Sequence, residues 1–328
     1  MTTPVPPATG EPITIPLWPI VVHGITPPRI PTIQYRDPDG QIWDLSDASL
    51  DKGYVCTAIA GIEGIPVMMQ TIPMLDGTAI PTIYIPQTGT IGLAVLITRP
   101  ASNSQDDYYK LLDAFARAFL NRRKENPAPG YIIITRPDRP ARQIAVYCIS
   151  GLNTPEVGLN DTTLYSLALA TPDPYWSDVT QTSFPLIAPN NKGILPVGPF
   201  PATPIVLDPA AVFGKTSVFN PSTGLIYPDW WITGPGTPIM KNLSSGRQWS
   251  LTAPIPAGDV VHAVTQRGKQ MIVDTTSGQN LWPHLVTVGP HDLWPLLGNT
   301  NNNLSIEMTG STPQTHVEMR YYGRWSRA

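Results

Sequence analysis

Cysteine is almost absent from this chain of 328 residues, which has only Cys56 and Cys148. Two cysteines cannot form the disulfide framework of a small secreted domain, and both lie in apolar stretches, so we expect buried free thiols. The first residues lack the basic segment and apolar core of a secretory signal. No run approaches the roughly 20 apolar residues of a membrane-spanning helix. We therefore expect a protein made in a reducing cytoplasm, without membrane insertion.

Charged residues are also scarce, at 14% of the chain with a net charge of −3. Average proteins have about 25%, and general nucleic-acid binders usually have a basic excess. We therefore expect no specific nucleic-acid binding. Few charges leave a neutral surface of the kind that subunit interfaces require, which favours a permanently assembled protein. An ordinary proline-rich β protein is the alternative.

The motifs of common catalytic sites are missing. The sequence has no glycine-rich phosphate loop and no Gly-x-Ser-x-Gly elbow. None of its five histidines lies four residues from another, as in a helical zinc pair. Asp259 and Asp274 follow or precede turn residues and suit turn capping better than a pair of catalytic acids. We expect no enzyme, no cofactor and no metal.

Proline is abundant, with 39 residues. Because proline fixes φ and lacks a backbone donor, residues 1–31 are predicted to be an extended arm, and residues 183–204 a linker. Residues 32–182 then form a β-rich domain with one helix. Residues 205–328 form a second domain of strands alone.

One helix is predicted from Gln105 to Lys124. Ser104 and Asp107 suit a capping box at its start. Apolar residues then recur at helical spacing: Tyr108, Leu111, Leu112, Phe115 and Phe119. Pro127 prevents the helix from continuing.

The remaining patterns predict strands, so the fold class is mainly β. Alternate apolar residues in Ile91–Arg99 indicate a half-buried strand. Tyr131–Thr135 and Arg142–Ile149 indicate two more, joined by a turn. Residues 37–40, Asp-Pro-Asp-Gly, are a further turn, so their acids are interpreted as turn formers. Similar alternation continues to the end of the chain, as in a β-sandwich.

Leu-Trp-Pro occurs twice, at residues 281–283 and 293–295. Trp282 and Trp294 are candidate glycan contacts, because sugar CH groups pack on aromatic faces. Tryptophan also fills cores and anchors interfaces, which is the competing interpretation. A carbohydrate-binding β-sandwich module is accordingly the alternative function.

Several motifs, in order, resemble those of one family. Residues 170–176, Ala-Thr-Pro-Asp-Pro-Tyr-Trp, are similar to an Ala-x-x-Asp-Pro-Tyr signature. Later motifs are Ala257-Gly258-Asp259, Val273-Asp274-Thr275, Leu293-Trp294-Pro295-Leu296 and Gly298-Asn299. This series resembles the distal tail proteins (Dit) of siphophages, which are long-tailed phages. The resemblance covers most of the chain and is weakest in the proline-rich arm.

The resemblance implies a structural hub in the virion, at the distal end of the tail (the baseplate or tail tip). An N-terminal β-sandwich-like domain would form a homo-hexameric ring, with C-terminal galectin-like β-sandwiches outside it. The implied partners are the tail tube protein, a tail-associated or tail-tip protein, and receptor-binding proteins. The arm and the strands in Ile91–Arg99 and Tyr131–Thr135 are the predicted ring faces, through edge pairing between subunits.

Overall fold

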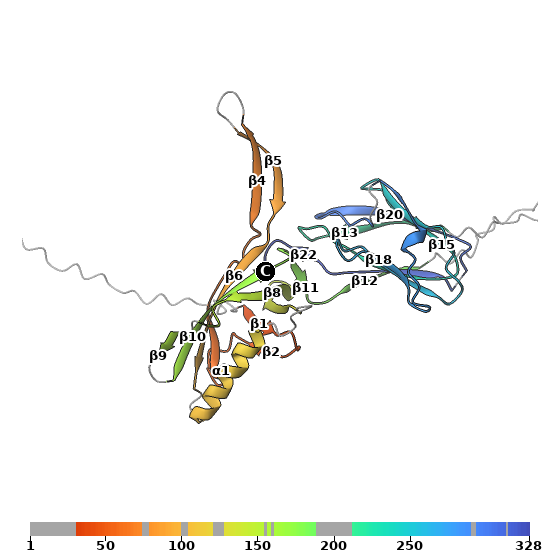
Figure 1. Ribbon diagram of the computed structural model, residues 1–328. Coiled ribbons are helices and arrows are strands. Elements are labelled where there is room, and N and C mark those ends of the chain that lie inside the picture. Colours follow the sequence, from red (N-terminus) through yellow and green to blue (C-terminus); the bar gives the residue numbers. More distant parts are fainter. Residues whose placement is uncertain are drawn as a thin grey trace, which may run out of the picture. The chain divides into compact units, whose positions relative to one another are not determined.

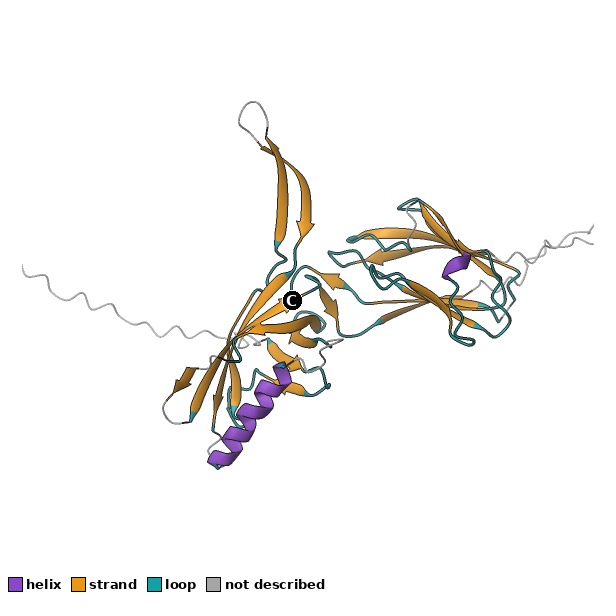
Figure 2. Cartoon of the chain, viewed as in Figure 1, coloured by secondary structure: helices purple, strands orange, loops and turns teal. Residues whose placement is uncertain are grey.

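The computed structural model describes residues 31–73, 79–99, 104–120, 128–153, 156–158, 161–187, 212–289, 293–312 and 314–328. Within these residues the chain is mainly β with one α-helix, which confirms the predicted fold class (Figures 1 and 2). The predicted arm lies outside the described residues, apart from Pro31. None of the described helices is long and apolar enough to cross a membrane.

The first half of the chain forms one ten-stranded sheet whose main strand order is β2-β1-β7-β8-β10-β6-β3. Its strands are β1 (Thr32–Arg36), β2 (Ile42–Asp44), β3 (Tyr54–Ala60), β6 (Gly89–Thr98), β7 (Gly130–Thr135), β8 (Arg142–Ser150), β9 (Glu156–Gly158), β10 (Thr162–Thr171) and β11 (Trp176–Asp178), joined by the late strand β22 (Arg324–Trp325). The two end strands β2 and β3 approach each other, because the Cys56 amide donates to the Leu45 carbonyl at 2.7 Å. The Trp43 and Tyr54 rings also meet, at 5.3 Å between centroids. The sheet therefore curls back on itself.

Helix α1 (Gln105–Phe119) begins at the predicted capping box, in which Ser104 and Asp107 bond each other's backbone amides. Its buried side chains join the core of the curled sheet. The helix is shorter than predicted: Leu120 is already extended and 51% exposed, because the apolar face ends at Phe119. The Tyr35 hydroxyl donates to the carbonyl of Ala118 at 3.0 Å and satisfies one free group of this helix end.

Strand β6 confirms the predicted alternation, with Ile91, Leu93, Val95 and Ile97 all buried. The predicted turn at Asp37 is also present. The Asp37 carboxylate accepts hydrogen bonds from the amides of Asp39 and Gln41 at 3.0 and 2.8 Å. Its role is to hold a turn, as in the interpretation from sequence.

The second half is a β-sandwich of two five-stranded sheets with the orders β12-β21-β14-β17-β18 and β13-β20-β15-β16-β19. Its elements are β12 (Thr182–Ile187), β13 (Val212–Asn220), β14 (Asp229–Thr233), β15 (Thr237–Asn242), β16 (Arg247–Leu251), β17 (Val260–Val264), β18 (Met271–Asp274), the 3-10 helix η1 (Trp282–His284), β19 (Leu285–Val288), β20 (Thr300–Thr309) and β21 (His316–Tyr321). One buried cluster between the sheets contains Trp230, Trp249 and Trp294. All the strand pairs are antiparallel, so inward and outward residues alternate.

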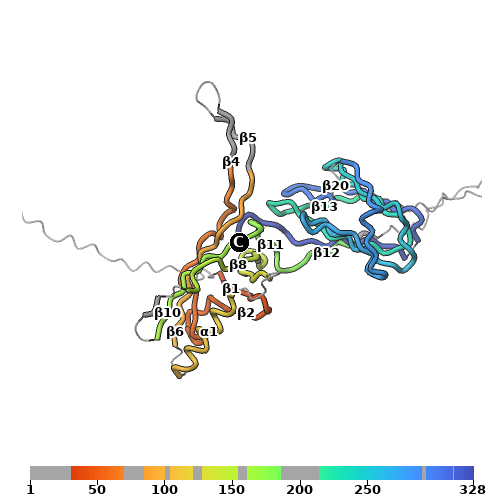
Figure 3. Tube along the Cα trace, in the orientation of Figure 1, coloured from red at the N-terminus to blue at the C-terminus, as the bar shows by residue number. Residues whose placement is uncertain are grey.

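Two strands depart from the domain limits predicted from sequence. β12 begins at Thr182 and pairs with β21, so residues predicted as linker belong to the sandwich. β22 lies in the predicted C-terminal domain but pairs with β11 of the first half, where Trp176 faces Trp325. The chain thus leaves the first half after β11 and returns to it after β21 (Figure 3).

Candidate assembly surfaces

A two-stranded hairpin extends from the curled sheet without further strand partners among the described residues. It consists of β4 (Val67–Pro73) and β5 (Ala79–Pro86) and is inserted between the paired strands β3 and β6 (Figure 1). Eight residues of extended chain give β5 a length of about 26 Å. In the ribbon view the hairpin stands clear of the sheet from which it arises.

The base of this hairpin exposes apolar side chains on both of its faces. Val67 and Met69 are 54% and 51% exposed, and they lie on one face because strand side chains alternate. Met68 and its cross-strand partner Ile85 are 42% and 37% exposed on the other face. An isolated hairpin is marginally stable in water, and clustered apolar exposure indicates an interaction site. Both features favour a partner that covers the hairpin.

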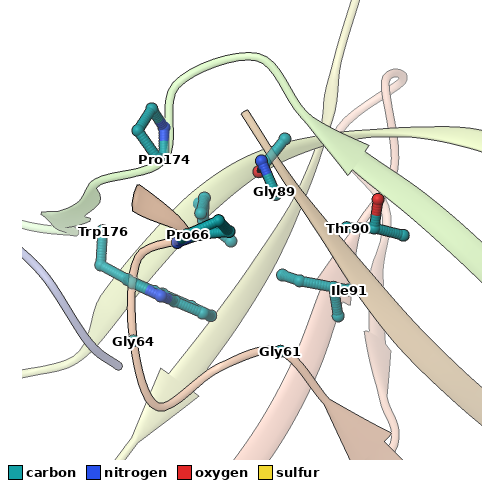
Figure 4. A pocket seen from close by; sticks show the side chains of 10 residues that line it. Gly61, Gly64, Pro66, Gly89, Thr90, Ile91, Pro174 and Trp176 are labelled. Carbon is teal, nitrogen blue, oxygen red and sulfur yellow. Dashed lines mark hydrogen bonds between the residues drawn. The ribbon is translucent and has the colours of Figure 1, made fainter. Parts of the chain in front are cut away.

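The hairpin is firmly joined to the sheet at its base. The Gln87 amide donates to the Pro66 carbonyl at 2.7 Å, and the Gly89 amide to the Thr171 hydroxyl at 3.0 Å. Gly61 has φ +83°, and a Cβ there would lie 2.5 Å from a backbone oxygen, so glycine is required. A small pocket beside these residues is lined in part by the buried Trp176 (Figure 4). The described residues that line it include no titratable side chain.

The strands predicted as ring faces are interior strands. β6 lies between β10 and β3, and β7 lies between β1 and β8, so their backbone groups are already paired. Edge pairing between subunits through these two strands is therefore a wrong prediction. Alternating apolar residues show that a strand is half-buried, but they do not show its place in the sheet.

The two Leu-Trp-Pro copies have different environments. Trp294 is fully buried, with its Nε1 donating to the Met240 carbonyl at 3.3 Å and its ring in edge contact with Trp230, 5.4 Å away. It cannot contact a glycan in this fold, so that candidate is wrong. Trp282 is partly buried at the start of η1 and packs against the same core. Its glycan contact stays a prediction.

A polar cluster on the outer face of the sandwich surrounds Trp231. The His262 ring stacks on Trp231 at 4.1 Å, and the Arg320 guanidinium lies 5.0 Å from its centroid. β17 and β21 flank β14 on opposite sides, so these two groups approach the ring from opposite strands. Trp231 is consequently not an open platform for a sugar. The sequence did not single out this cluster.

The ionisable groups of this cluster respond mainly to burial and to their partners. Desolvation lowers the pKa of His262 and raises the pKa of Asp229. The two groups lie 3.9 Å apart, between His262 Nε2 and an Asp229 carboxylate oxygen, and their mutual attraction makes both pKa shifts smaller. Hydrogen bonds from Arg320 and Ser183 lower the pKa of Glu318 to about 2. No group of three metal-ligating side chains occurs among the described residues. Because the lowered pKa leaves His262 neutral at pH 7, the ion pair of this cluster is the one between Glu318 and Arg320.

No protein-family model and no curated protein matches the chain. Among solved structures, the SPP1 Dit protein (gp 19.1) matches with a TM-score of 0.60, 11% identity and coverage of 90% of this chain and 99% of that one. That protein is described as a paradigm of the hub adsorption apparatus of phages infecting Gram-positive bacteria. Two structures of the phage p2 baseplate in its activated conformation, with Sr and with Ca, give TM-scores of 0.48 and 0.49 at 10% identity. The chain therefore has the fold of the SPP1 Dit protein, as its sequence motifs predicted.

Proposed function

We propose that this protein is the structural hub of a siphophage tail tip. Six copies form a closed ring that joins the tail tube to the tail-tip and receptor-binding proteins. The curled sheets lie side by side in this ring, and the galectin-like sandwiches lie outside it. Its role is assembly and involves no catalysis. The shared fold supports the proposal, and the observation that carries it is the apolar hairpin.

The hairpin needs a surface that the described residues do not supply. Val67 and Met69 on one face and Met68 and Ile85 on the other stay 37–54% exposed in the single chain. Burying apolar area gains about 25 cal/mol per Å², so packing against a neighbour would stabilise both the hairpin and the assembly. In a ring each subunit presents two different faces, and a hairpin that extends from one can lie on the next.

The test compares two aspartate variants by sedimentation velocity. Val67→Asp places a charge on the hairpin, and Val288→Asp is the matched control on β19 of the sandwich, because both valines are 54% exposed strand residues. We expect the unmodified chain and Val288→Asp to sediment as hexamers. Val67→Asp should sediment as a monomer, because a charge buried at an interface is costly.

Circular dichroism of both variants checks that the fold persists. A hexameric Val67→Asp would exclude the hairpin as a ring contact. An unmodified chain that is monomeric and binds sugars on a glycan array would favour the carbohydrate-binding module instead.

A further inference from the structure

After β21 the chain returns to the first half as the segment Gly323–Ala328, here termed the return segment. β22 within it pairs with β11, and its last residue, Ala328, is 1% exposed. The chain therefore passes between the two halves twice, first from β11 to β12 and then from β21 to β22. The contacts of the return segment are polar and specific.

Arg324 is the centre of these contacts. One terminal nitrogen donates to both oxygens of the Asp173 carboxylate at 2.7 Å, and the other donates to the Leu225 carbonyl at 3.1 Å. Its guanidinium also lies over the ring of Tyr175, 4.3 Å from the centroid, and 5.2 Å from that of Tyr227. Charge-assisted hydrogen bonds and stacking both favour arginine over lysine at such a position.

The residues of the first half that hold Arg324 belong to the Asp-Pro-Tyr motif. Asp173 supplies the carboxylate and Tyr175 supplies the ring, while the intervening Pro174 restricts the backbone between them. The Asp173 carboxylate also accepts from the Tyr175 amide at 3.1 Å, which fixes the turn. The motif therefore forms a preformed site for one guanidinium.

The rest of the return segment is bound along its length. The Trp325 Nε1 donates to Asp178 at 2.7 Å, and its ring lies 3.9 Å from the Arg142 guanidinium. Arg142 also donates to the Arg327 carbonyl at 2.8 Å. At the end of the segment, the Ala328 amide donates to the Ile62 carbonyl at 3.1 Å. Arg142 is buried, which lowers its pKa, so these contacts also solvate a buried cation.

The sandwich meets the same segment through the loop between β13 and β14. The Gly224 amide donates to the Arg324 carbonyl at 3.0 Å, and the Arg324 amide donates to the Ser222 hydroxyl at 3.0 Å. A Cβ on Gly224 would lie 2.7 Å from the Tyr175 ring. Gly298 packs closely against this loop, and a Cβ on residue 298 would lie only 2.8 Å from the Gly224 carbonyl oxygen. Two motifs distant in sequence, Asp-Pro-Tyr and Gly298-Asn299, thus support one junction.

We propose that the return segment is a built-in peptide ligand of the first half, recognised through Arg324 by Asp173 and Tyr175. Its binding makes the two halves a single cooperative unit. The sandwich is then held by two crossings, and movement of one half is transmitted to the other. This inference is independent of the ring, because all the contacts lie within one chain.

Hydrogen exchange of the full-length chain, followed by mass spectrometry, tests the proposal. Arg324→Ala should accelerate exchange in residues 324–328 and 222–226 by about tenfold or more, since losing hydrogen bonds to a charged group favours local opening by that factor. Asp173→Asn should also accelerate hydrogen exchange at residues 324–328 and 222–226. Arg324→Lys should give an intermediate effect, because lysine keeps the positive charge but lacks the planar guanidinium group with its several donors.

Arg320→Ala is the matched control, since Arg320 is a paired arginine of the neighbouring strand β21 that does not contact the segment. We expect it to leave exchange at residues 324–328 unchanged. If Arg324→Ala does not fold, Arg324→Lys and Asp173→Asn carry the test. Unchanged exchange at residues 324–328 in these variants would overturn the proposal, and so would acceleration there that leaves exchange at residues 222–226 of the sandwich unchanged.

Discussion

The two Leu-Trp-Pro copies allow a direct test of the sandwich core. Trp294→Ala removes a fully buried indole, its hydrogen bond to Met240 and its edge contact with Trp230. Such truncations cost about 3–5 kcal/mol, because a cavity remains. Trp282→Ala, in the same three-residue context, should cost about 1–2 kcal/mol, because that ring is only partly buried.

Guanidinium denaturation followed by far-UV circular dichroism measures both changes without depending on tryptophan fluorescence. The midpoint should fall much further for Trp294→Ala, with a similar slope for both variants. If Trp294→Ala does not fold, Trp294→Phe should still lose about 1–2 kcal/mol, mainly through the lost hydrogen bond. Equal effects of the two alanine variants would refute the assignment of Trp294 to the core and Trp282 to its margin.

Two further predictions concern local electrostatics and helix capping. Glu318 has a pKa of about 2 in the folded chain, below its usual 4.5, so its stabilising contribution is present above pH 4.5 and lost as the pH falls toward 2. Glu318→Gln should therefore lower the melting temperature at pH 7 but not at pH 2, and an equal loss at both would contradict the ion pair. Ser104→Ala removes the cap of α1 and should cost about 1 kcal/mol in denaturant melts, where an unchanged midpoint would count against the capping box.

Local signals predicted much of this fold. The capping box at Ser104 and the alternation in β6 depend on neighbours within a few residues, so both can be predicted from the sequence. The place of β6 and β7 in the sheet depends on distant partners, and the prediction of edge pairing through them was wrong. The full burial of Trp294 and the only partial burial of Trp282 also depend on distant contacts.

Two structural features were missed for identifiable reasons. The hairpin strands include Pro73 and Pro81, which argue against a central strand. A two-stranded ribbon has only edges, so prolines are tolerated there. The return segment was missed because β22 has two residues and its partner β11 lies about 150 residues earlier. Arg324 has no local pattern that indicates a carboxylate partner in the Asp-Pro-Tyr motif.

The central claim is that copies of this chain assemble into a closed ring. Native mass spectrometry of the unmodified full-length protein at micromolar concentration tests it most directly. The account predicts one dominant species with the mass of six 35.7-kDa chains. A single 35.7-kDa species at every concentration would contradict it.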